Sequence, residues 1–397
     1  MTALQLDPGS MPVPLYGTGS LADLVPSVLA SIGTPGFANV LALPAAAAAC
    51  VLLVDGLGAE LIRAHVADAP VLNAAIIAGG RDLTAGFPST TAASIASIGT
   101  GLPPGQHGVV GYQVRIPGTQ RLMNSLRWDP LVDPLKWQPD KTAFERATAA
   151  GTSVVQVAKR EFEGGGLNRA VLRGAESVGA DTFGEVAADA LEQVGDALDN
   201  RRPGFVYAYV ADLDWTGHGH GVGSAAWRFQ LQLVDRLVEQ MAENLPVGAR
   251  LYVTADHGMI DVPLERRIDL DNPAESALIE GVQVVGGEAR ARYLYVRDGA
   301  LDDVLATWRE RLGNDAVVCT RDEAIDAGWF GPVSDRARPR IGDVVVAAVA
   351  DIAIVATTRQ PGESRLVGHH GSLTPAEQLV PLAAFEGSAR RTGRVGT

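Results

Sequence analysis

The chain is organised around Phe87-Pro88-Ser89-Thr90-Thr91-Ala92-Ala93-Ser94-Ile95-Ala96-Ser97-Ile98-Gly99-Thr100-Gly101, a turn followed by a short apolar segment. Pro88 starts the turn, hydroxyl residues follow, and alanine and isoleucine then recur at helical spacing until two glycines end the pattern. The N-terminus of a helix presents free backbone N–H groups and attracts anions. A hydroxyl at this place is either an ordinary helix cap or a nucleophile beside a bound phosphoryl group.

The composition indicates a large acidic α/β protein. Its 397 residues are 47% hydrophobic, include 45 glycines and carry a net charge of −13. This charge disfavours nonspecific binding to nucleic acid, although bound metal ions would still allow a small anionic substrate. Cys50 and Cys319 form no disulfide framework, and residues 1–8 do not resemble the start of a signal peptide. We therefore expect a cytoplasmic protein that does not enter a membrane.

Apolar runs of strand length alternate with helical patterns over most of the chain. The strands are predicted at 50–54, 154–158, 205–210 and 250–255, and the helices near 21–31, 59–66, 92–98, 181–198 and 225–244. Several of the strands run directly into a polar residue and then a helix. This order predicts a mostly parallel central sheet that is covered by helices on both faces.

The pattern changes after residue 264. A hairpin at 282–285 and 292–296, a helix at 301–312 and a further strand pair at 343–349 and 352–356 predict a smaller unit. We expect residues 265–340 to form an α+β insertion, and residues 1–264 with 341–397 to form the core. Residues 113–145 show little periodicity, and we interpret them as a loop over a site.

Six aspartates and histidines lie mainly after apolar strands and beside glycines: Asp55, Asp214, His218, Asp256, His257 and His370. Singly, each is as easily explained as a helix cap, a turn or an ordinary histidine. Together they form a set of oxygen and nitrogen ligands without a thiolate, which suits Zn²⁺ or Mn²⁺ in a hydrolytic site. Six ligands are too many for one ion that keeps an open position, so the set predicts two divalent ions.

These segments resemble the alkaline phosphatase superfamily, in its nucleotide pyrophosphatase/phosphodiesterase branch. The matching pieces are Val54-Asp55-Gly56, Phe87-Pro88-Ser89-Thr90-Thr91, Asp212-Leu213-Asp214-Trp215-Thr216-Gly217-His218, Asp256-His257-Gly258-Met259 and His369-His370-Gly371. The resemblance implies a three-layer α/β/α core. It assigns one metal to Asp55, Thr91, Asp256 and His257, and the other to Asp214, His218 and His370. It makes Thr91 the nucleophile, with Thr90 as the alternative.

Within the branch, the chain is most similar to actinobacterial cyclic di-AMP phosphodiesterases. This implies hydrolysis of a nucleotide phosphodiester through a phosphothreonine, with cyclic di-AMP giving the linear dinucleotide and AMP. We also expect a monomer that binds no duplex nucleic acid. The chain departs from the family at Tyr112, where the phosphodiesterases usually carry asparagine. We expect Tyr112, Trp128 and Trp137 to contact the substrate. The alternatives are a phosphonoacetate or phosphomonoester hydrolase, or a non-catalytic nucleotide receptor on the same scaffold.

Overall fold

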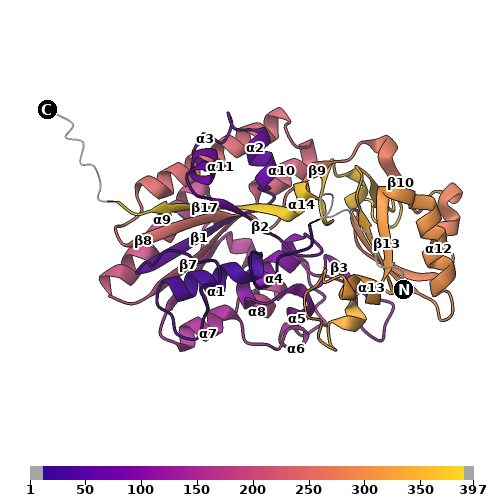
Figure 1. Ribbon diagram of the computed structural model, residues 1–397, viewed down its shortest axis with the longest axis horizontal. Coiled ribbons are helices and arrows are strands. Elements are labelled where there is room, and N and C mark those ends of the chain that lie inside the picture. The colour runs from indigo at the N-terminus through magenta and orange to yellow at the C-terminus, as the bar shows by residue number, and fades with distance from the viewer. Residues whose placement is uncertain (1–11, 389–397) are drawn as a thin grey trace.

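A seven-stranded sheet forms the centre of the protein in the computed structural model, which describes residues 12–388 (Figure 1). Its strand order is β2-β17-β8-β1-β7-β5-β6. The bounds are β1 Ala48–Val54, β2 Arg81–Thr84, β5 Ser153–Ala158, β6 Glu176–Gly179, β7 Gly204–Val210, β8 Ala249–Thr254 and β17 Leu379–Glu386. Strands β8, β1, β7, β5 and β6 are parallel, and β17 is antiparallel to β8 and β2. The predicted mostly parallel sheet is confirmed.

Helices cover both faces of this sheet (Figure 1). One layer contains α1 Leu21–Ser31, α4 Thr91–Thr100, α7 Ala143–Ala149 and α8 Gly166–Val171, and the other contains α2 Ala59–Ala64, α3 Pro70–Ile77, α9 Phe183–Asp199 and α11 Ala225–Glu243. Helix α9 shows why these segments dock as they do. Its buried side chains Val186, Ala190 and Val194 recur every four residues, and Thr182 caps its start. Among residues 12–388, none of the helices has the length and apolar character that crossing a bilayer requires.

A second, four-stranded antiparallel sheet lies beside the core. Its order is β11-β12-β14-β13, with bounds β11 Val282–Glu288, β12 Ala291–Val296, β13 Ala316–Thr320 and β14 Val344–Ala348. Helix α12, Leu301–Leu312, packs on it through the buried Trp308, and α13, Arg321–Asp326, follows β13. Strand β14 lies beyond residue 340, so this sheet extends past the expected end of the insertion. The division of the chain into two domains stays a prediction.

The strand pair expected at 343–349 and 352–356 is wrong. Strand β14 pairs with β12 and β13, whereas β15, Ala353–Val355, pairs in parallel with β10, Arg267–Asp269. The backbone N–H groups of Val349 and Ala350 donate to the carbonyl of Asp315, at 2.8 and 3.1 Å. These hydrogen bonds direct the chain after β14 toward Asp315, which directly precedes β13. The following residues therefore do not form a hairpin with β14.

The region 113–145 is more ordered than its sequence indicates. It contains a hairpin of β3, Gln113–Arg115, and β4, Leu122–Asn124, followed by α6, Pro134–Trp137. Val114 and Met123 on this hairpin are buried. Strands of three residues are too short to show an alternating pattern, which explains why the sequence reads as a loop.

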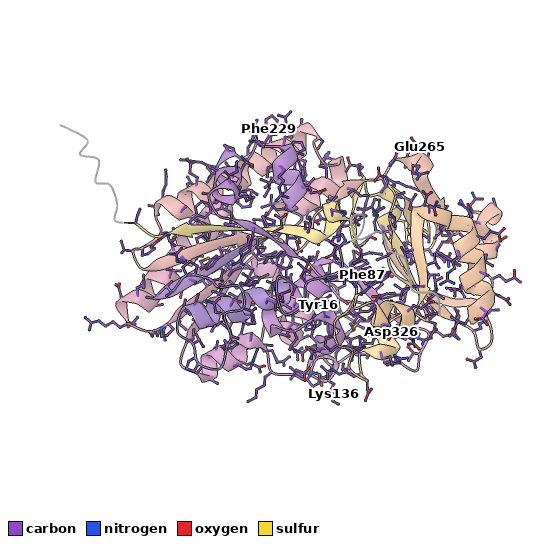
Figure 2. The ribbon with its side chains drawn as sticks, viewed as in Figure 1. Tyr16, Phe87, Lys136, Phe229, Glu265 and Asp326 are labelled. Atoms are coloured by element: carbon purple, nitrogen blue, oxygen red, sulfur yellow. The ribbon has the colours of Figure 1, made fainter. Side chains whose placement is uncertain are left out.

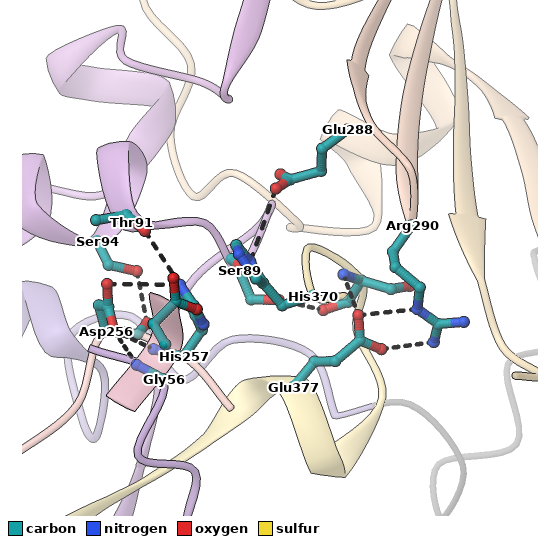
Figure 3. A network of polar contacts seen from close by, with 12 residues as sticks. Gly56, Ser89, Thr91, Ser94, Asp256, His257, Glu288, Arg290, His370 and Glu377 are labelled. Carbon is teal, nitrogen blue, oxygen red and sulfur yellow. Dashed lines mark hydrogen bonds and ion pairs between the residues drawn. The ribbon is translucent and has the colours of Figure 1, made fainter. Parts of the chain in front are cut away.

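Two sets of contacts hold the small sheet to the core. Arg290 forms a buried, two-pronged ion pair with Glu377 of α14, Pro375–Gln378, with N···O distances of 3.1 and 2.6 Å (Figure 3). Phe87 lies at the junction (Figure 2), where its ring contacts Trp329 and Phe330 at centroid distances of 4.9 and 5.3 Å. The turn before α4 therefore packs directly against the segment that connects β13 to β14 of the small sheet.

Candidate active site

The site is built where three neighbouring strands end. In the register of the sheet, Val54 pairs with Val210 and Leu53 pairs with Thr254. The residues that follow β1, β7 and β8 consequently lie side by side at one edge, where open α/β sheets bind ligands. Asp55 follows β1, helix α10, Asp212–His220, follows β7, and Asp256 follows β8.

Two glycines allow these strand ends to approach closely. A Cβ atom added to Gly58 would lie 2.7 Å from the Cα of Gly258, and one added to Gly258 would lie 1.9 Å from the carbonyl oxygen of Ala376. Both distances are far below a van der Waals contact. Glycine is required here by the packing of the strand ends against each other and against α14.

Thr91 stands at the start of α4 and faces the ligand cluster. Thr90 is the extended N-cap residue and Thr91 the first residue of the helix. The Thr91 Oγ1 lies 3.2 Å from the Nε2 of His257 (Figure 3). Ser94, one turn later, donates its hydroxyl to the carbonyl of Asp256 at 2.7 Å and ties the helix to the end of β8. Helix geometry thus points Thr91 at the strand ends.

All three predicted histidine ligands have the same orientation. The Nδ1 atoms of His218, His257 and His370 lie 2.8, 2.9 and 2.9 Å from backbone carbonyl oxygens, namely those of Gly368, Gly258 and Ser89. A carbonyl only accepts, so each Nδ1 carries the proton and donates it. This leaves Nε2 as the ring atom through which each histidine would bind a metal ion. The rings of His257 and His370 also stack, with centroids 3.5 Å apart.

Three aspartates contribute buried oxygens that lack a donor. No group within residues 12–388 donates a hydrogen bond to Asp55 Oδ1, Asp214 Oδ1 or Asp256 Oδ2. The other oxygen of Asp256 accepts from the backbone N–H groups of Gly56 and His257, both at 3.0 Å. Buried carboxylate oxygens without a donor are costly unless a cation neutralises them. The donor set therefore fits divalent cations.

The ligand atoms fall into two overlapping groups, in each of which they lie within 4.8 Å of one another. One group is Asp214, His218 and His370, and the other is Asp55, Asp214 and His257. Asp214 belongs to both, and its Oδ2 is 3.2 Å from the Nε2 of His218 one turn later on α10. The predicted ligand Asp256 belongs to neither group, although its Oδ2 lies 3.5 Å from the Nε2 of His257.

The electrostatics of the cluster favour a bound cation. Burial, together with the neighbouring charges of Asp256 and Asp214, raises the pKa of Asp55 well above its usual range. Burial likewise raises the pKa of Asp256. Burial opposes the charge on His218, but attraction to Asp214 outweighs it and raises the pKa of His218 to about 9. The same attraction holds the pKa of Asp214 below its usual value despite burial.

Two further residues of the site are absent from the predicted set. The Tyr209 hydroxyl, on β7, donates to Asp55 Oδ2 and so fixes the rotation of this carboxylate. Glu288, at the end of β11, is buried with its Oε2 3.7 Å from His370 Nδ1 (Figure 3). Burial raises the pKa of Glu288 well above its usual range. The small sheet therefore supplies part of the wall of the site.

Two of the predicted aromatic contacts, Trp128 and Trp137, pack against other side chains, whereas the predicted metal ligands meet at the strand ends. Trp137 is 5% exposed, and the guanidinium carbon of Arg340 lies 3.7 Å from the centroid of its ring. Trp128 donates its Nε1–H to the carbonyl of Val132 at 2.8 Å and meets Trp137 edge-on at 6.3 Å. Tyr112 is half-buried at the start of the β3–β4 hairpin. Both tryptophans thus make substantial contacts with the protein itself.

The aspartates and histidines gather at one edge of the central sheet of a three-layer fold, beside a threonine that begins a helix. This arrangement is typical of the alkaline phosphatase superfamily. A family model described as "Type I phosphodiesterase / nucleotide pyrophosphatase" matches residues 49–373. The chain belongs to this family.

Two relatives share recognisable sequence with the chain. An uncharacterized pyrophosphatase/phosphodiesterase of Schizosaccharomyces pombe is 28% identical over 194 residues, which is 47% of this chain and 39% of the relative. Ectonucleotide pyrophosphatase/phosphodiesterase family member 1 of Mus musculus is 27% identical over 249 residues, which is 59% of this chain and 26% of the relative. The matches thus span less than half the length of either relative.

Solved structures share the fold at lower identity. Murine ectonucleotide pyrophosphatase/phosphodiesterase 5 superposes with a TM-score of 0.66 and 17% identity, over 86% of this chain and 89% of that one. Phosphonoacetate hydrolase of Sinorhizobium meliloti, in complex with phosphonoformate, gives a TM-score of 0.63 and 18% identity, over 87% and 91% of the two chains. The α/β fold is common to all three proteins.

Proposed function

We propose that this protein is a phosphodiesterase that holds two divalent ions and hydrolyses nucleotide phosphodiesters. The observation that carries the proposal is a cluster beside Thr91 of three buried carboxylate oxygens that lack a hydrogen-bond donor and three histidines whose Nδ1 atoms are bonded to backbone carbonyls. Asp55, Thr91, Asp256 and His257 hold one ion, and Asp214, His218 and His370 hold the other. The ions, Zn²⁺ or Mn²⁺, supply the positive charge that activates a hydroxyl and stabilises a leaving oxygen.

Thr91 is the proposed nucleophile. Its Oγ1 gives its proton to solvent and attacks phosphorus, the bond to the leaving oxygen breaks, that oxygen takes up a proton from solvent, and a phosphothreonine forms. Water then hydrolyses the phosphothreonine and restores the hydroxyl. The murine relative with the shared fold has been solved as an inactive threonine-to-alanine variant in complex with AMP, which supports a threonine in this role and a nucleotide as ligand.

Cyclic di-AMP is our leading substrate, cleaved to the linear dinucleotide and then to AMP. Tyr112, Trp128 and Trp137 remain the proposed substrate contacts, with Tyr112 in the place of the family's asparagine as a hydrogen-bond donor. The second candidate is a phosphonoacetate or phosphomonoester hydrolase, favoured by the fold shared with the Sinorhizobium meliloti enzyme. We further propose a cytoplasmic monomer, in keeping with the free, buried Cys50 and Cys319.

One set of measurements tests these proposals. The purified protein is analysed for metal content and is then offered cyclic di-AMP, its linear dinucleotide, phosphonoacetate and a chromogenic phosphodiester, with product analysis. We expect two ions per chain, turnover of the diesters and loss of turnover on chelation. An active chain with one ion or fewer contradicts the two-ion proposal. Turnover of phosphonoacetate alone supports the second candidate, and a loaded protein without any turnover is a receptor.

A further inference from the structure

Helix α10 exposes a large aromatic ring beside the ligand cluster. Trp215 directly follows Asp214 and precedes His218 by three residues, and it is 80% exposed, the highest value for a large hydrophobic residue within 12–388. The other five tryptophans are buried or half-buried. Single exposed apolar residues are common on protein surfaces, so exposure alone assigns no role. The position of this ring beside two ligand residues is what calls for an explanation.

The helix surface next to Trp215 is bare on one side. Residues four apart lie on the same face of a helix, and their side chains lean toward its N-terminus. A side chain at position 219 would therefore lean back over Trp215. Gly219 has none, and a Cβ atom built on it meets nothing within 4 Å in the described part of the chain. No side chain at position 219 therefore covers the Trp215 ring.

The same helix fixes the relation of the ring to the ligands. Asp214 and His218 share a face, and each residue turns the helix by about 100°. Trp215 is consequently about 100° around the helix from Asp214 and about 60° from His218, so its side chain leaves the helix beside the ligand pair. A ligand with a phosphoryl group at the Asp and His cluster and an aromatic group one short linkage away fits this layout.

We propose that Trp215, with the bare surface at Gly219, is the stacking platform for an aromatic base of the substrate. This inference rests on the proposed function and narrows it to substrates that carry a base. Every nucleobase has a face that stacks on an indole ring, with little dependence on sequence. Phosphonoacetate has no aromatic face and gains nothing from such a platform.

Calorimetric titration of the metal-loaded protein with AMP and with ribose 5-phosphate separates the base from the rest of the nucleotide. In Trp215→Ala, the affinity for AMP should fall about 5- to 150-fold, while that for ribose 5-phosphate stays the same. Trp215→Phe should restore most of the AMP affinity. Phe229→Ala is the matched control, since Phe229 on α11 is also well exposed, at 66%, and should change neither ligand.

A second variant tests the bare surface. Gly219→Leu should lower the affinity for AMP and leave the affinity for ribose 5-phosphate unchanged. Its melting temperature should not fall, because leucine is a better helix former than glycine. The platform is refuted if Trp215→Ala binds AMP as tightly as wild type does. It is also refuted if Trp215→Ala loses affinity for AMP and ribose 5-phosphate equally, or if wild type binds the two ligands with equal affinity. Because the experiment measures binding, it tests the platform whether or not the wild type hydrolyses diesters. Absence of hydrolysis by the wild type would contradict the proposed function only.

Discussion

Replacing Tyr209 by phenylalanine tests whether the Asp55 carboxylate is held in place for a cation. The change removes one hydroxyl that donates to Asp55 Oδ2, in a setting where both side chains are buried. A hydrogen bond to a charged group contributes about 1.5–3 kcal/mol. Loss of a partner that orients a metal ligand costs about 10- to 100-fold in affinity, or about 1.4–2.7 kcal/mol. The two ranges agree, so we expect the dissociation constant for Zn²⁺ or Mn²⁺ to rise by about 10- to 100-fold.

The strand itself provides the matched control. Tyr207 lies two residues earlier on β7 and is also buried, but its hydroxyl finds no hydrogen-bond partner in the stretch 12–388. Tyr207→Phe should therefore leave metal affinity unchanged. The assay is competition with a chelator of known affinity, together with melting curves of the metal-free variants. Equal metal affinity in Tyr209→Phe and wild type, or equal losses in both variants, would refute the reasoning.

Two further predictions concern the site, and a third concerns His107, a fully buried residue at the end of α5, Pro104–His107. Thr91→Ala should lower turnover in a diester assay by about three orders of magnitude or more at an unchanged melting temperature. Turnover by Thr90→Ala should stay within about tenfold of wild type. The reverse order would place the nucleophile at Thr90. Asp256→Asn keeps an oxygen for the two backbone donors but loses its charge, so kcat should fall far more than KM rises, and equal changes in steady-state kinetics would mean that the ions chiefly hold the substrate. Burial, with a smaller contribution from Arg336, lowers the pKa of His107 from 6.5 to about 3, so its stabilising effect is full above pH 6.5 and declines as the pH falls toward 3. The melting temperature of His107→Gln should consequently vary less over that interval than that of wild type, and parallel curves would contradict this.

The sequence predicts the centre of the fold better than its edges. Buried parallel strands are continuous apolar runs, so β1, β7 and β8 are recognisable without any knowledge of their partners. The edge strand β2 has four residues, and β17 contains Pro381, which weakens a strand signal. The pairing of β15 with β10 depends on a contact between residues far apart in the chain, which no local pattern reports.

The same distinction applies to the site. The predicted ligands sit in short motifs, most of them at the end of a strand or on the helix that follows it. The structure groups five of them, Asp55, Asp214, His218, His257 and His370, and places Asp256 and Thr91 beside His257. Tyr209 and Glu288 acquire their roles only through partners distant in sequence, Asp55 and His370. A tyrosine within an apolar strand looks like an ordinary core residue until the strand order is known. Trp215 lies inside a predicted motif, but its exposure depends on how α10 docks.

The contact between Gly58 and Gly258 has a consequence for the evolution of this scaffold. Within Asp55-Gly56-Leu57-Gly58 and Asp256-His257-Gly258, selection for folding acts on the glycines, while selection for chemistry acts on the acids and the histidine. In a lineage that loses its catalytic task, the chemistry no longer selects for the aspartates, yet any side chain at either glycine still forces the strand ends apart. Descendants without activity should therefore keep both glycines in altered motifs. A library screened only for soluble protein should give the same outcome.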